Sequence, residues 1–76
     1  MVDRAMLTQH LARAEELVHV GAEYVAGQQR LVADLEGHGH DGRLARELLT
    51  TFEQSQAMHV VDRDRIAAEL AEASEM

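Results

Sequence analysis

The chain contains no cysteine, no proline, no lysine and no tryptophan among its 76 residues. Without cysteine there are no disulfides and no thiolate zinc sites, which are common ways to stabilise a chain too short for a large core. Without proline, the strongest helix-breaking residue is missing. Alanine and leucine are abundant, whereas there is only one phenylalanine and one tyrosine. This composition predicts an all-α protein with a single domain over residues 1–76.

Positive charge is also scarce, because seven arginines stand against 14 acidic residues and the net charge is −7. The acidic residues are spread over both halves of the chain, so no basic face for phosphate groups is expected. We therefore expect no binding to nucleic acid or to anionic membranes. No segment approaches the roughly 20 apolar residues that span a bilayer, and the N-terminus lacks the layout of a signal peptide. These features predict a cytoplasmic protein.

From the predicted N-cap Asp3 onward, apolar or small residues recur every three or four positions, which predicts a helix over about residues 4–36. This stripe consists of Leu7, Leu11, Ala14, Val18, Gly21, Val25, Gln28, Val32 and Leu35. A second row beside it consists of His10, Leu17, Tyr24 and Leu31. A stripe of this width suits a multi-helix bundle better than a two-stranded coiled coil. Gly37 is expected to end the helix in the left-handed conformation.

Residues 37–42 form the one predicted turn, and Asp41 is expected to cap a second helix over about residues 42–74. The second stripe consists of Ala45, Leu48, Leu49, Phe52, Gln56, His59, Arg63, Ile66, Leu70 and Ala73. Because the connection is short, the two helices should form an antiparallel hairpin. A lone hairpin would leave five large side chains uncovered: Leu17, Tyr24, Leu31, Leu44 and Leu48. We therefore expect a homodimer or higher homo-oligomer that forms a four-helix bundle.

Because the chain folds back at the turn, a residue of the first helix should lie opposite the residue of the second helix for which the two numbers sum to about 80. The predicted pairs are Val32 with Leu48, Gln28 with Phe52, Gly21 with His59, and Ala14 with Ile66.

His59 lies at the centre of the second stripe, where a leucine would be expected. Other polar or small residues lie near the same height, and they predict a polar layer within the interface. This layer consists of Gly21, Tyr24, Gln28, Gln56, His59, Asp62 and Arg63. One interpretation is a hydrogen-bonded core histidine that fixes the register of the helices. The alternatives are a metal or ligand site, or a pH-sensitive assembly switched by protonation of His59.

Two sets of residues match the spacing of known catalytic motifs, but we do not expect either set to catalyse a reaction. Ser55, His59 and Asp62 share one face of one helix, which supplies no oxyanion hole because its interior N–H groups are already bonded. Glu16 and His19 match the Glu-x-x-His pattern of di-iron bundles, but their positions point away from the stripe and toward solvent. We therefore predict no enzymatic activity and no cofactor.

The turn is the better candidate for a metal site. His38, His40 and Asp41 place two imidazoles and a carboxylate within four residues, which are ligands suited to zinc, nickel or copper. The alternative is a simple turn in which Asp41 caps the second helix and the histidines are solvated.

Several segments, taken in order, resemble a set of short hypothetical proteins of soil alphaproteobacteria. The segments are His10–Glu15, Glu23–Ala26 followed by Gln29–Arg30, Ala45–Leu49, Phe52–Gln54 and His59–Arg65. The resemblance covers nearly the whole chain. It implies a bacterial, cytoplasmic helical hairpin and no catalytic residues.

The sequence therefore predicts a small, non-enzymatic, homo-oligomeric interaction or regulatory module, with an unidentified protein as a possible further partner. The two alternatives are a metal-binding hairpin that uses His38, His40 and Asp41, and a pH-sensitive assembly switched at His59. A hairpin that binds RNA would share the architecture, but the acidic balance argues against it.

Overall fold

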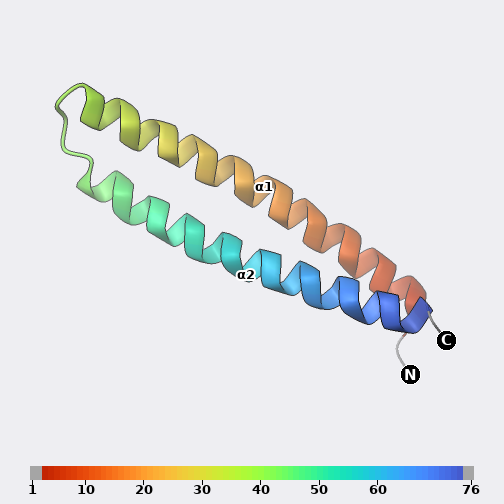
Figure 1. The fold of residues 1–76 in the computed structure, drawn as a ribbon. Helices are drawn as coiled ribbons and strands as arrows, with labels where there is room; N and C mark the ends of the chain where they lie inside the picture. The colour runs from red at the N-terminus through yellow and green to blue at the C-terminus, as the bar shows by residue number, and fades with distance from the viewer. Residues whose placement is uncertain (1–2, 75–76) are drawn as a thin grey trace.

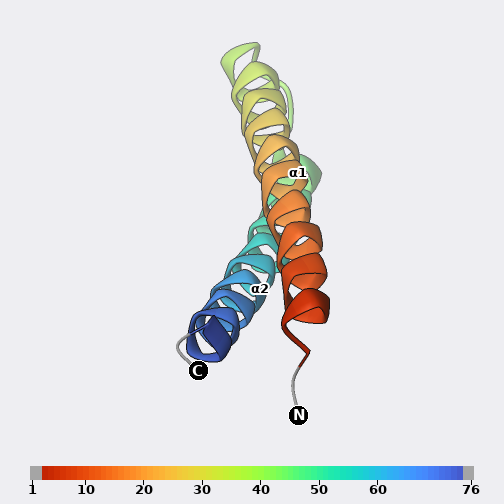
Figure 2. The same ribbon diagram turned by 90° about the vertical axis from the view of Figure 1, so that its right-hand side faces the viewer.

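The structure is a computed structural model that describes residues 3–74. It consists of two packed helices, α1 (Arg4–Gly37) and α2 (Arg43–Ser74), and the described residues contain no strand. The helices run in opposite directions from the turn, so that the start of α1 and the end of α2 lie at one end (Figure 1). Seen from the side, they cross one another (Figure 2). The chain measures 58 × 14 × 14 Å. The all-α helical hairpin is confirmed, and both helices begin and end within one residue of the predicted bounds.

An aspartate side chain bonds to the first turn of each helix, and α1 begins at its predicted N-cap Asp3. The Asp3 carboxylate accepts a hydrogen bond of 2.9 Å from the Ala5 N–H and satisfies one of the free donors at the start of α1. The Asp41 carboxylate likewise accepts a bond of 3.0 Å from the N–H of Arg43, the first residue of α2. The first helical bond of α2 runs from the Arg46 N–H to the Gly42 carbonyl at 2.9 Å, so Gly42 rather than the predicted Asp41 is the N-cap residue, and Asp41 bonds to the helix from one position before it.

The end of α1 differs from the prediction, because Gly37 is still helical and does not adopt the left-handed conformation. Gly39 does so instead, with φ of +75°. The Gly39 N–H donates to the Glu36 carbonyl at 3.1 Å, and the His40 N–H donates to the Leu35 carbonyl at 2.8 Å. This pair of bonds is a Schellman motif, which needs a left-handed residue one position beyond the cap residue His38. The last turn of α1 therefore extends further than the first glycine suggests.

The hydrophobic core is small and lies mainly at the end of the hairpin opposite the turn. The buried apolar residues there are Leu7, Ala14 and Ile66, and Leu11, Leu70 and Ala73 pack against them half-buried. Val32 is the other buried apolar residue and lies toward the turn. Within residues 3–74, neither helix has an apolar stretch long enough to cross a bilayer.

Candidate interaction surface

Two glutamine side chains, one from each helix, donate hydrogen bonds to the backbone of the other helix. Gln28 of α1 donates a hydrogen bond from Nε2 to the Ala45 carbonyl of α2 at 3.0 Å. Gln56 of α2 donates from Nε2 to the Val18 carbonyl of α1 at 2.8 Å. Each carbonyl has a second lone pair that can accept such a bond while it serves its own helix. The two bonds tie the side chains of each helix to the backbone of the other.

Gly21 provides the space for the Gln56 side chain. A methyl group at Gly21 would overlap Oε1 of Gln56 and lie 2.9 Å from its Cδ. The oxygen therefore lies along the direction of a glycine Cα–H bond, an arrangement that recurs where helices approach closely. Oε1 is buried and accepts no hydrogen bond within the described part of the chain.

This contact corrects the predicted register. Gln56 rather than His59 occupies the space in front of Gly21. Phe52 packs its ring against Tyr24, with centroids 5.7 Å apart, while Gln28 bonds to the Ala45 carbonyl. The predicted pairs of Gly21 with His59 and of Gln28 with Phe52 are therefore wrong by about one helical turn. The shift places the Gln56 amide within hydrogen-bond distance of the Val18 carbonyl.

The fourth predicted pair lies at the end opposite the turn. Ala14 and Ile66 pack in the same buried cluster.

Many large apolar side chains are exposed. They are Met6, Leu17, Val20, Tyr24, Leu31, Leu44, Leu48, Met58 and Val61. The five residues that were expected to be uncovered in a lone hairpin are all among them, with Tyr24 61% and Leu44 72% exposed. This prediction is confirmed.

The exposed residues from the two helices form one surface. Leu17, Tyr24 and Leu31 are one heptad apart and therefore share a row along α1, while Leu48 and Asp62 share a row along α2. The contact between Tyr24 and Phe52 joins the first row to α2. A shallow groove of about 250 Å³ joins the two rows nearer the open end, and it is lined by His10, Arg13, Ala14, Leu17, Asp62, Arg65 and Ile66. We call the surface formed by Leu17, Val20, Tyr24, Leu31, Leu44 and Leu48 the apolar flank.

The Glu-x-x-His motif of α1 lies outside the apolar flank. Glu16 and His19 have 65% and 75% of their side chains exposed. Glu16 lies 4.0 Å from Arg13, and His19 lies 3.2 Å from Glu23. The Glu-x-x-His pair therefore faces solvent, as predicted, and its side chains pair with neighbours on the same helix.

His59 is half-buried and lines a shallow groove of about 650 Å³ on the surface of α2. The groove is lined by Ser55, Ala57, Met58, His59, Val61, Asp62 and Arg65. Asp62 pairs with Arg65 at 2.7 Å, and no hydrogen bond within residues 3–74 links it to Ser55 or His59. The three residues of the triad-like pattern share the surface without forming a relay.

Arginines near this groove pair within α2. Arg65 binds both Asp62 and Glu69, at 2.7 and 3.1 Å, and hydrogen bonds to these two carboxylates, Asp62 first, raise the pKa of its guanidinium. Arg63 pairs with Asp64 at 2.9 Å. The polar residues predicted to form one layer therefore divide: Gly21, Gln28 and Gln56 lie between the helices, whereas Asp62 and Arg63 form pairs along α2.

The histidine-rich turn makes local contacts. His38 Nδ1 lies 2.8 Å from the Asp34 carbonyl and 3.4 Å from its carboxylate, while the Asp41 carboxylate accepts a hydrogen bond from the Arg43 N–H. Within the described residues, no three histidine, aspartate or glutamate side chains are grouped as a metal ion would require.

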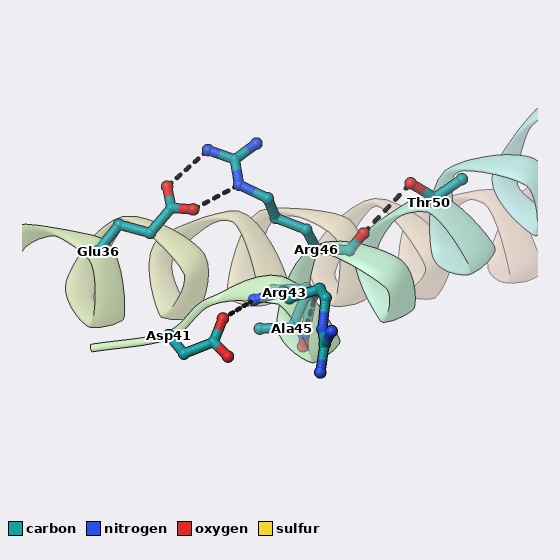
Figure 3. A network of polar contacts seen from close by, with 7 residues as sticks. Glu36, Asp41, Arg43, Ala45, Arg46 and Thr50 are labelled. Carbon is teal, nitrogen blue, oxygen red and sulfur yellow. Dashed lines mark hydrogen bonds and ion pairs between the residues drawn. The ribbon is translucent and has the colours of Figure 1, made fainter. Parts of the chain in front are cut away.

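An ion pair that the sequence pattern did not predict joins the two helices at the turn end of the hairpin. Arg46 donates from Nε and Nη2 to the two carboxylate oxygens of Glu36, each at 2.5 Å (Figure 3). This hydrogen bonding, more than the charge of Arg46, lowers the pKa of Glu36. Gly42 lies under the pair, since a methyl group there would come within 3.0 Å of the Glu36 Cγ. The residues that flank the turn carry opposite charges, and this feature of the sequence could have predicted the ion pair.

No protein-family model, no curated protein and no solved structure matches this chain. The resemblance to alphaproteobacterial proteins stays a prediction, and functional inference depends on the surface itself.

Proposed function

We propose that the protein is a non-enzymatic, cytoplasmic homodimerisation module, in which the apolar flank of one hairpin packs on the same flank of a second copy to form a four-helix bundle. The observation that carries this proposal is the apolar flank, where large side chains such as Tyr24 and Leu44 are mostly exposed. Contiguous exposed apolar surface marks interaction sites in proteins.

The exposed area of the hairpin is large enough for a second copy of the chain to bind. The chain exposes 5752 Å². A compact monomer of 8.5 kDa exposes about 4,650 Å², so this hairpin exposes about 1,100 Å² more than its mass requires. A standard protein interface removes about 800 Å² from each partner. A second copy would therefore cover most of the excess.

The composition of the flank supports a self-complementary contact. Its members are aliphatic or aromatic, and Tyr24 is already held in place by Phe52. Aromatic side chains with restricted freedom are favoured at the centre of interfaces because little entropy is lost on binding. The acidic excess of the chain also disfavours nucleic acid as the partner.

The test is a pair of double variants measured by light scattering after gel filtration. Leu31→Glu combined with Leu48→Glu places two charges on the apolar flank, where both leucines are about half exposed. Ala12→Glu combined with Ala71→Glu adds the same charge at exposed helix positions away from the flank. We expect the flank variant to have the mass of one chain at concentrations where the control is a dimer. Equal masses for the two variants would contradict the proposal.

A further inference from the structure

The apolar flank is not uniform along the hairpin. Toward the turn it presents Leu31, Leu44 and Leu48, with Tyr24 next along α1. Toward the open end, beyond Leu17, the same face of the hairpin carries charged or polar side chains around the shallow groove. These are His10, Arg13, Asp62, Arg65 and Glu69. Met6 is the one large exposed apolar residue of the described chain that lies beyond them. The surface thus has an apolar half and a charged half.

The charged half is electrically balanced. Arg13 and Arg65 stand against Asp62 and Glu69, and Arg65 already bridges both of these acids. Two copies of such a region can approach without net repulsion, and their ion pairs can stay hydrated at the edge of a contact. If the same charges were covered by leucine, they would lose water without gaining a partner, which is costly.

We infer that the two hairpins pack with their turns at the same end, related by a two-fold axis that runs along the length of the bundle. This inference rests on the proposed function, because it names the orientation of the second copy on the same flank. In this arrangement Leu31, Leu44 and Leu48 of one copy meet the same leucines of the other. The balanced charges meet their own copies at the open end.

The opposite orientation fits the flank less well. A two-fold axis across the middle of the hairpin would lay the leucines near one turn on Arg13, Asp62 and Arg65 of the other copy. Sliding the copies until their apolar halves overlap avoids this mismatch. It also leaves the open end of each hairpin without a partner and reduces the area that is covered.

Distances between spin labels distinguish the two orientations, and the absence of cysteine makes single labelling direct. One variant carries a nitroxide at His40→Cys in the turn, and a second carries it at Ser74→Cys at the open end. Both positions are exposed. Because each chain has one label, every measured distance is between copies. Dilution with unlabelled protein is the control for that assignment.

With the turns together, we expect both variants to give distances of about 30 Å or less, since the labels are separated only by the width of a four-helix bundle. In the opposite orientation the turn labels would be separated by most of the 58 Å length of the hairpin. A dimer by mass that gives long distances at both positions would overturn the orientation and leave the proposed function standing. A monomer by mass, with no dipolar signal from either label, would overturn both.

Discussion

The contact between Gly21 and Gln56 allows a substitution effect to be calculated in two backgrounds. A glycine within a helix costs about 1 kcal/mol relative to alanine, so Gly21→Ala would normally stabilise the protein. Here the added methyl group would overlap Oε1 of Gln56 and force that side chain to move. Its Nε2 would then lose the 2.8 Å bond to the Val18 carbonyl.

The two effects are similar in size. The lost hydrogen bond is worth about 1 kcal/mol. Expelling Oε1 costs no further bond, because it accepts none in its present position. We therefore expect Gly21→Ala to change the free energy of unfolding by less than about 0.5 kcal/mol when Gln56 is present. In the Gln56→Ala background nothing obstructs the methyl group, and the same change should stabilise by about 1 kcal/mol.

Urea denaturation of the four proteins of this double-mutant cycle, at one fixed chain concentration, measures the difference. Ala12→Gly, at an exposed position of α1, reports the helix propensity effect alone and should cost about 1 kcal/mol. The reasoning is refuted if Gly21→Ala stabilises equally in both backgrounds, because Gln56 would then not occupy the space in front of Gly21.

Three further predictions concern the turn. Glu36 has a pKa below its ordinary value of 4.5 because of the hydrogen bonds from its arginine partner, so its stabilisation is present above that pH and is lost as the pH falls through the folded-state pKa. Glu36→Gln should therefore flatten the decrease of the melting temperature below about pH 4.5, and an unchanged acid profile would contradict the ion pair. Gly39→Ala should destabilise by about 1 kcal/mol because of its positive φ, whereas Gly37→Ala, which is helical, should stabilise by about 0.5 kcal/mol in the same denaturation assay. Replacing both His38 and His40 by Asn should leave the melting temperature unchanged with and without added zinc. A zinc-dependent rise in the melting temperature of the unmodified protein that the variant lacks would show instead that the turn binds metal.

The fold was predictable because the periodicity of the chain is regular. Apolar spacing located both helices, Asp3 located the start of α1, Asp41 located the start of α2 to within two residues, and the row containing Leu17, Tyr24 and Leu31 indicated the side that stays exposed. These properties depend on local sequence and on the period of the helix, and neither requires knowledge of the partner helix.

The contacts between the helices were less predictable. A heptad pattern looks the same after each two turns, so it does not fix how far α2 slides along α1. The pairing of Gln56 with Gly21 is determined by the reach of the amide to the Val18 carbonyl. The choice of Gly39 over Gly37 depends on which carbonyls the turn N–H groups can reach. These are properties of three-dimensional geometry that a one-dimensional pattern does not contain.

The most direct test of the central claim is the mass of the unmodified protein in solution, measured by sedimentation equilibrium over a range of concentrations. Association through the apolar flank predicts a mass of about twice the 8.5 kDa chain at micromolar concentration, with dissociation only on dilution. A mass of one chain at all concentrations, with the helical signal intact, would contradict it, because Tyr24 and the leucines of the flank would then face water in a stable monomer.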